Sequence, residues 1–202
     1  MPDNKWNERY SGPEYRFGTE PADFLRRAAE HLEPGQTALC IADGEGRNSV
    51  WLAERGLSVT AMDASPVGVE KARKLAAQRG VEVDFHVADI AGWDWDAAHY
   101  DVVVGVFFQF AEPDLRARIF DGMKRALRPG GLLLLHGYAP RQVAYGTGGP
   151  PQRENMYTTE LLADAFAGFD VLRLEDYDAE ISEGTGHSGR SALVDLIARK
   201  PL

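Results

Sequence analysis

Short apolar runs alternate with amphipathic segments along the chain up to residue 137. Each run spans five to eight residues and is bounded by turn-forming residues, which is the pattern of a buried strand. Between the runs, apolar side chains recur at helical spacing. The predicted strands of this region cover residues 38–42, 57–62, 81–88, 101–108 and 132–137.

Glycine and proline mark where the predicted helices begin and end. Ser65 and Pro66 supply an N-cap and a first-turn proline, and Gly80 ends the helix that they begin. Gly56 ends the preceding helix in the same way, and a turn at 128–131 precedes the fifth strand. The predicted helices cover residues 21–32, 48–55, 66–79, 112–127 and 159–166.

The pattern changes after residue 137. Residues 141–157 form a loop rich in glycine and proline, and so long a loop in a compact domain usually serves a function. Two further strands, 170–181 and 191–199, flank the polar loop 182–190, which suits an antiparallel pair. Strands that alternate with helices form a doubly wound, mostly parallel sheet. The sequence therefore predicts a seven-stranded α/β fold with an antiparallel edge strand, in a single domain over residues 1–202.

The loop after the first strand predicts a site for a nucleotide-like ligand. Gly44 and Gly46 let the backbone turn sharply, and the helix that follows offers N–H groups to an anion. Asp63 ends the second strand, where a carboxylate can accept both hydroxyls of a ribose. Asp89 ends the third strand, where it can hold an exocyclic amine of adenine while the N–H of Ile90 meets a ring nitrogen. The simpler interpretations are a plain turn, a surface aspartate and a helix or turn cap.

The spacing favours a single nucleoside over a dinucleotide. A dinucleotide fingerprint would place a third glycine at position 49, where Ser49 stands. The sequence also lacks the Tyr-x-x-x-Lys pair of short-chain dehydrogenases. An oxidoreductase is therefore the weaker interpretation.

Composition narrows the class of protein further. The 202 residues carry 22 basic and 31 acidic side chains, and the net charge of −9 disfavours nucleic acid and anionic membranes as partners. Cys40 is the single cysteine, which excludes a cysteine-rich zinc site, and no histidine spacing predicts a metal. The apolar runs are too short to span a membrane, and the polar N-terminal segment lacks a signal-peptide core. We expect a cytoplasmic protein and leave its oligomeric state open.

Five segments carry a family resemblance by their order and spacing: LCIADGEGRN, VTAMDASPVGVEKAR, VEVDFHVADI, YDVVVGVFFQF and LRPGGLLLL. They resemble class I S-adenosylmethionine-dependent methyltransferases. The leader WNERYSGPEYRFGTEP and the GEGRN loop are similar to the tellurite-resistance methyltransferases and their thiopurine-methyltransferase-like relatives. The resemblance implies the Rossmann-like methyltransferase fold, S-adenosylmethionine as cofactor, and an N-terminal arm over residues 1–18 that covers it. Cys40 and Ala42 depart from the family's acidic-x-Gly-x-Gly-x-Gly pattern.

The resemblance also implies which residues contact the cofactor. Trp6 and Tyr10, with Phe17 beside them, are expected to cover it, and ordinary core packing by the arm is the simpler interpretation of these aromatic residues. Asp43 and Glu45 are expected to replace part of the carboxylate function that position 40 lacks. The expected cofactor contacts are Trp6, Tyr10, Ala42, Asp43, Gly44, Arg47, Asp63, Ala64, Asp89, Ile90 and Val106.

The methyl acceptor is expected at the ends of the later strands, where aromatic side chains gather. Arg141, His187 and Arg190 lie on two late loops and predict a pocket for an anion in an otherwise acidic protein. A plain solvated hairpin is the simpler interpretation of residues 183–190. The expected acceptor contacts are Phe107, Phe108, Tyr138, Arg141, Tyr145, His187 and Arg190.

The expected reaction is methyl transfer to a small, soft or anionic acceptor, such as a tellurite- or selenite-like oxyanion or a thiol. Such a reaction depends on alignment and exclusion of water more than on acid–base catalysis, so the sequence assigns no catalytic residue. The alternatives are a methyltransferase for another small O- or N-acceptor and a non-catalytic S-adenosylmethionine-binding protein. A nucleic-acid or protein methyltransferase is disfavoured, because VFFQ follows the fourth strand in place of an Asn-Pro-Pro-Tyr-type tetrad.

Overall fold

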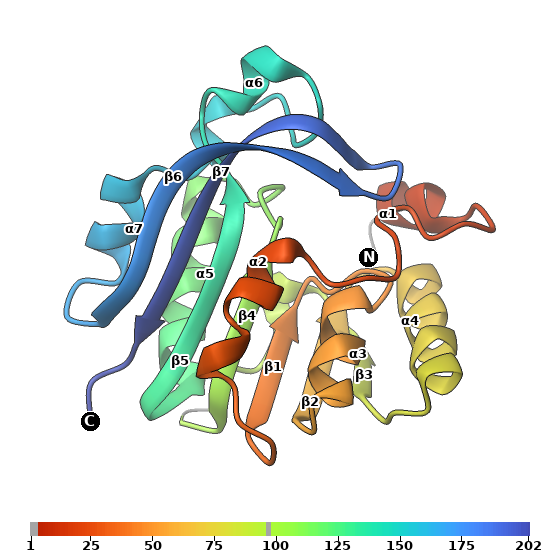
Figure 1. Cartoon of the computed structure of the whole chain (residues 1–202), viewed down its shortest axis with the longest axis horizontal. Helices are drawn as coiled ribbons and strands as arrows, with labels where there is room; N and C mark the ends of the chain where they lie inside the picture. The colour runs from red at the N-terminus through yellow and green to blue at the C-terminus, as the bar shows by residue number, and fades with distance from the viewer. Residues whose placement is uncertain (1–3, 96–97) are drawn as a thin grey trace. The chain divides into compact units, whose positions relative to one another are not determined.

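The computed structural model describes residues 4–95 and 98–202 (Figure 1). The chain divides into two units. The first unit comprises Met1–Asp94 with Glu183–Gly186, and the second comprises Trp95–Ser182 with His187–Leu202. Residues 1–3, the start of the predicted N-terminal arm, lie outside the described residues. The single domain over residues 1–202 stays a prediction.

The first unit contains three parallel strands and the helices that connect them. Its elements are α1 (Asn4–Tyr10), α2 (Asp23–Arg27), the 3-10 helix η1 (Ala29–His31), β1 (Thr37–Ile41), α3 (Arg47–Glu54), β2 (Ser58–Asp63), α4 (Pro66–Arg79), β3 (Asp84–Val87) and η2 (Ile90–Gly92). β2 pairs with β1 on one side and with β3 on the other. The predicted caps of α4 are confirmed, because Ser65 Oγ accepts a hydrogen bond from the N–H of Gly68 (3.1 Å) and Gly80 adopts a left-handed φ of +68°.

The second unit contains the remaining four strands. Its elements are β4 (Tyr100–Val106), α5 (Pro113–Ala126), β5 (Leu127–Tyr138), α6 (Gln142–Tyr145), η3 (Arg153–Asn155), α7 (Thr159–Ala165), β6 (Asp170–Glu183) and β7 (His187–Arg199). β5 pairs in parallel with β4 and antiparallel with β7, and α5 lies along the back of β4 and β5 (Figure 1). Valines of β4 and leucines of β5 are fully buried, as their uninterrupted apolar runs predict.

The strand order is β3-β2-β1-β4-β5-β7-β6. This mixed, mostly parallel order confirms the predicted Rossmann-like methyltransferase fold. The antiparallel strand β7 lies between β5 and the edge strand β6. Ligands of such sheets bind outside the carboxyl ends of the parallel strands, so the residues that follow β1, β2, β4 and β5 decide the function.

Several predicted boundaries were wrong. β6 and β7 continue through the predicted loop 182–190, so only a short turn at 184–186 remains and both His187 and Arg190 lie on β7. Paired backbone groups favour this extension, because an antiparallel ladder satisfies N–H and C=O groups that a loop leaves to water. The predicted loop 141–157 contains α6 and η3, and the predicted helix 21–32 is divided into α2 and η1.

Candidate cofactor and acceptor sites

The loop between β1 and α3 folds through three left-handed residues. Ala42, Gly44 and Gly46 have φ values of +48°, +62° and +88°. A Cβ on Gly46 would lie 2.6 Å from the Cβ of Ala72 on α4, and a Cβ on Gly44 would lie 2.7 Å from Oη of Tyr10. Both glycines are therefore required by conformation and by close approach. Ala42 adopts the same conformation with a Cβ, which costs about 1–2 kcal/mol.

Asp63 ties this loop to the end of β2. Its Oδ2 accepts the N–H of Gly44 and its Oδ1 accepts the N–H of Ser65, both at 2.8 Å. The side chain is buried, so Asp63 is not a surface aspartate. Burial raises the pKa of its carboxyl, and the two backbone hydrogen bonds oppose that rise.

Asp43 turns back onto the start of α3. Its carboxylate accepts hydrogen bonds from both the N–H (3.3 Å) and the hydroxyl of Ser49. Burial raises the pKa of Asp43 to about 7, and Ser49 opposes the shift. The serine that replaces the third glycine of a dinucleotide fingerprint thus holds the loop in place.

The N-terminal arm lies over this loop. The buried ring of Tyr10 stacks on Trp6 with a centroid distance of 5.7 Å and meets the edge of Phe17. Burial raises the pKa of Tyr10, and the nearby carboxylates of Asp63 and Glu45 raise it further. The structure thus brings Trp6, Tyr10 and the Gly44 loop together, and their contact with a cofactor stays a prediction.

Glu45 anchors the arm, a role that the sequence analysis missed. Its Oε2 accepts the N–H of Arg16 and its Oε1 pairs with Nζ of Lys71, at 2.8 and 2.7 Å. Lys71 also donates to the carbonyl of Glu14 (2.7 Å), and the hydroxyl of Tyr15 donates to the carbonyl of Lys71 (3.1 Å). These bonds join the arm to both the loop and α4.

Arg47, at the start of α3, forms a buried ion pair with Glu183 at the end of β6. The Nη2 to Oε2 distance is 2.8 Å, and both side chains are less than a tenth exposed. The turn that follows lies against the arm, since the N–H of Gly186 donates to the carbonyl of Arg16 (2.9 Å). Glu183 is not among the predicted contacts, because the sequence placed it in the polar loop 182–190 and not at the end of a strand.

The remaining predicted cofactor contacts are less distinctive. Asp89 is exposed and caps η2 by accepting the N–H of Ala91 (2.9 Å), which is the simpler role that its sequence position allowed. Ile90 is buried, Ala64 is half-buried, and Val106 is the last residue of β4. Their contacts with a cofactor stay predictions.

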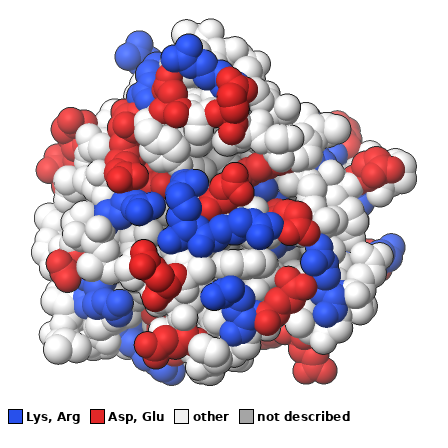
Figure 2. Space-filling model, in the orientation of Figure 1, with Lys and Arg blue, Asp and Glu red and all other residues white. Residues whose placement is uncertain are grey.

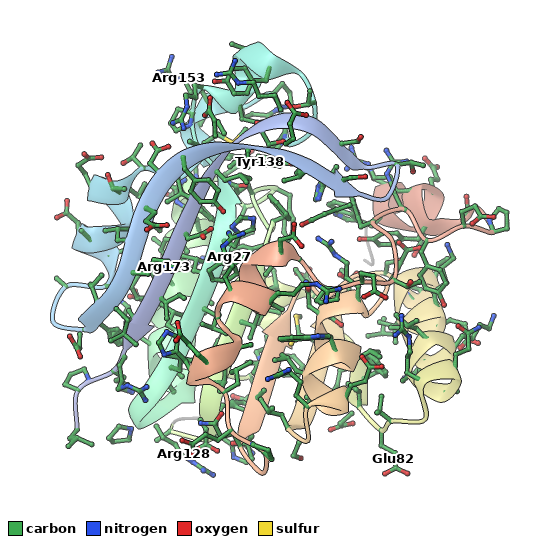
Figure 3. All side chains as sticks on the ribbon, viewed as in Figure 1. Arg27, Glu82, Arg128, Tyr138, Arg153 and Arg173 are labelled. Carbon is green, nitrogen blue, oxygen red and sulfur yellow. The ribbon has the colours of Figure 1, made fainter. Side chains whose placement is uncertain are left out.

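Four aromatic rings gather at the carboxyl ends of β4 and β5 in the second unit. Phe107 is 4.7 Å from His136, 4.6 Å from Tyr138 and 4.3 Å from His187, measured between ring centroids. The amide of Gln109 fixes Tyr138 by pairing with both its N–H and its carbonyl, each at 2.7 Å. Figure 3 labels Tyr138 at the end of β5. We call Phe107, His136, Tyr138 and His187 the aromatic cluster.

Phe108 is not part of the aromatic cluster and lies in the core. Its ring is fully buried and packs near Phe120 and Tyr157, with centroids 6.2 and 6.1 Å apart. Of these two phenylalanines, Phe107 has the left-handed backbone conformation (φ +55°) and Phe108 does not. The structure therefore gives Phe108 a core position, and its predicted contact with the acceptor has no geometric support.

The predicted anion pocket is occupied by acidic side chains. Arg190 pairs with Asp178 at 2.7 Å, and Arg141 pairs with both Asp176 and Asp178. Tyr145 also donates to Asp178 (2.6 Å), and these donors hold the pKa of Asp178 well below its usual range. The two arginines therefore meet equal acidic charge. On the face shown in Figure 2, basic and acidic side chains are likewise interspersed.

A buried histidine–aspartate pair adjoins the aromatic cluster. His136 on β5 and Asp195 on β7 are directly opposite in the antiparallel register, with Nδ1 2.6 Å from Oδ1. Neither residue is among the predicted contact residues. One polar residue inside each of two apolar runs, LLLLHGY and ALVDLIA, is the signal that indicates them.

Comparisons with known proteins agree with this geometry. Residues 38–131 match the family described as a methyltransferase domain. The match covers just under half of the 202 residues and agrees with the strand order. Residues 38–131 form an S-adenosylmethionine-binding methyltransferase domain. The methyltransferase domain extends from β1 into β5.

Individual relatives of the methyltransferase domain are distant. A 2-heptyl-1-hydroxyquinolin-4(1H)-one methyltransferase of Mycobacteroides abscessus is 33% identical over 123 residues, covering 58% of this chain and 52% of its own. The chain spans about half the length of the curated relatives that it matches.

Two solved structures share the fold over almost the whole chain. A protein from a study of the conversion of a disulfide bond into a thioacetal group during echinomycin biosynthesis has a TM-score of 0.77 at 21% identity, covering 98% of this chain and 92% of its own. TehB from Haemophilus influenzae has a TM-score of 0.72 at 18% identity, covering 99% of this chain and 67% of its own. Identities this low establish the fold alone.

No helix in 4–95 or 98–202 has the length and apolar character needed to cross a membrane. Within the same ranges, no three histidine, cysteine or acidic side chains converge as metal ligands would.

Proposed function

We propose that this protein transfers the methyl group of S-adenosylmethionine to a small molecule and that its first unit holds the cofactor. The observation that carries this proposal is the arrangement around Gly44. A loop with no room for a Cβ, a buried carboxylate at the end of β2 and a covering tyrosine meet there. These are the features that a nucleoside with a flat base and a ribose requires. The bound cofactor supplies an electrophilic sulfonium methyl group.

Arg47 supports the fit with this cofactor. Its Nη1 is buried and has no hydrogen-bond partner among the described residues, whereas Nη2 is paired with Glu183. A buried donor without a partner costs about 1–3 kcal/mol. A carboxylate such as that of the cofactor's methionine part would remove this cost and would add a charge-assisted bond.

The acceptor is proposed to be small and to bind at the aromatic cluster. The sequence favours a soft or anionic acceptor, and its resemblance to the tellurite-resistance methyltransferases supports a tellurite-like oxyanion. However, Arg141 and Arg190 are paired with aspartates, which weakens anion binding. A thiol or another small O- or N-acceptor is therefore favoured over an oxyanion, and the Mycobacteroides relative, by its name, methylates an aromatic hydroxyquinolone.

The experiment is a transfer assay with S-adenosylmethionine labelled in its methyl group. The purified chain is incubated with thiols, phenols, amines and tellurite, and labelled product is separated from cofactor. Binding is measured in parallel as the rise in Tm with S-adenosylhomocysteine, since a ligand of the native state stabilises it by mass action. Binding with transfer supports the enzyme. Binding without transfer to any acceptor would favour the non-catalytic protein, and absence of both would contradict the proposal.

A further inference from the structure

The pairing of His136 with Asp195 places two ionisable groups in the interior of the second unit. Neither side chain has appreciable contact with solvent, since Asp195 is 0% and His136 is 2% exposed. A buried carboxylate is costly unless charged or polar donors surround it. Here the hydroxyl of Tyr177 on β6 donates to both oxygens of Asp195, at 3.1 and 3.2 Å.

This arrangement determines how the imidazole presents its two nitrogens. When Nδ1–H donates to the Asp195 carboxylate, the lone pair lies on Nε2, which is then the basic atom. The carboxylate also stabilises the imidazolium that forms when Nε2 takes a proton. A histidine held in this way has the two properties of a general base, namely a fixed tautomer and a counter-charge.

The surroundings of His136 distinguish it from an ordinary core histidine. It lies near the carboxyl end of β5, where ligands of this fold bind, and Phe107 covers it at a centroid distance of 4.7 Å. Phe107 is only half-buried and has the left-handed backbone that disfavours bulky residues. Strain of this kind gathers at sites that hold a ligand.

We propose that His136 is the general base for an acceptor bearing an aromatic hydroxyl, with Asp195 and Tyr177 as positioning residues. This inference rests on the proposed methyltransferase function and names its acceptor class. The hydroxyl proton passes to Nε2 of His136. The oxygen then bonds to the methyl carbon, and the electron pair of the broken carbon–sulfur bond remains on sulfur. The products are an aryl methyl ether and S-adenosylhomocysteine, and the imidazolium returns its proton to water.

The test uses acceptors that differ in one atom. 4-Methylphenol and 8-hydroxyquinoline carry hydroxyls, and 4-methylbenzenethiol and quinoline-8-thiol carry far more acidic thiols of the same shape. At pH 8, 4-methylbenzenethiol is already ionised and quinoline-8-thiol is partly ionised, so the thiols depend on a base far less than the hydroxyl compounds do. His136→Gln should therefore lower kcat/KM for the hydroxyl compounds by about 10²–10⁴-fold and for the thiols by less than about tenfold. His86→Gln, which changes an exposed histidine of the first unit, should leave all four values unchanged.

A second variant tests the proposal even if His136→Gln does not fold. Tyr177→Phe removes one donor from Asp195, so the carboxylate stabilises the imidazolium more strongly. The acid limb of kcat/KM for the hydroxyl compounds should then move to higher pH, while the thiol profile stays in place. Among the described residues, Asp195 contacts His136 directly and Tyr177 contacts Asp195, while Tyr138 and His187 lie against Phe107, which packs on His136.

The outcomes separate this inference from the proposed function. Equal losses on hydroxyl and thiol acceptors, in a folded His136→Gln that still binds S-adenosylhomocysteine, would show a purely structural pair. Methylation of thiols or tellurite but of no hydroxyl compound by the wild type would also overturn the inference and leave the methyltransferase intact. If His136→Gln does not fold, an unmoved acid limb in Tyr177→Phe overturns it. Failure to bind cofactor at all would overturn both proposals.

Discussion

Asp43 makes the stability of this protein depend on pH in a direction opposite to that of most carboxylates. Burial raises the pKa of Asp43 to about 7, whereas the pKa of an aspartate in the unfolded chain is about 3.9. Between these values the native state keeps a proton that the unfolded chain has lost. The free energy of unfolding must therefore fall as pH rises through this window.

The magnitude follows from the size of the window. Each pH unit over which the two states differ by one proton changes the free energy by about 1.4 kcal/mol. From pH 5 to pH 8 the contribution of Asp43 is therefore a loss of about 2–3 kcal/mol. Asp43→Asn cannot ionise, so its free energy of unfolding should fall less over the same range by that amount.

The assay is urea denaturation of both proteins at pH 5 and pH 8 without cofactor. Ser49→Ala serves as a check, because removal of the hydroxyl that donates to the ionised carboxylate should enlarge the wild-type loss. Parallel pH dependence in the wild type and Asp43→Asn would refute the reasoning, since it would mean that Asp43 titrates alike in the folded and unfolded chains.

Three further predictions concern the loop, the arm and the charged cluster. Ala42→Gly should raise the free energy of unfolding by about 0.5–1 kcal/mol in the same urea assay, because relief of left-handed strain exceeds the added backbone entropy; destabilisation would contradict it. Glu45→Gln should lose its pairing with Lys71 and speed proteolytic cleavage within residues 4–18, and an unchanged cleavage rate would remove Glu45 as the anchor. Arg190→Ala should change kcat/KM for tellurite less than threefold, because Asp178 already neutralises this exposed side chain; a larger loss would restore the anion pocket.

The fold was predictable because local signals agreed with each other. Ser65-Pro66 and Gly80 fix the ends of α4 through capping chemistry that depends on adjacent residues alone. The apolar runs of β4 and β5 likewise match fully buried strands. The length of β6 and β7 was less accessible, because their polar, exposed tips are extended by pairing with each other and not by their own composition.

The candidate site was predictable only in part, for a different reason. Gly44, Asp63 and Tyr10 could be named because their roles follow from position beside a strand end or from the family resemblance. The contact of His136 with Asp195 depends on the antiparallel register of β5 and β7, which aligns residues 59 positions apart. Similarly, Asp178 neutralises Arg190 only because folding brings these two residues together, and no local sequence pattern indicates that pairing.

Calorimetric titration of S-adenosylhomocysteine into the wild type and Asp63→Ala tests the central claim most directly. The variant loses the charge-assisted bonds from Gly44 and Ser65 to Asp63, together with the proposed acceptor for the ribose hydroxyls. We predict binding by the wild type and a Kd raised at least about tenfold in Asp63→Ala, since such bonds are worth about 1.5–3 kcal/mol. Asp89→Ala, which removes the exposed cap of η2, provides the comparison at the neighbouring strand end. Equal affinity of the wild type and folded Asp63→Ala, or no binding by the wild type, would contradict the assignment of the first unit as the cofactor site.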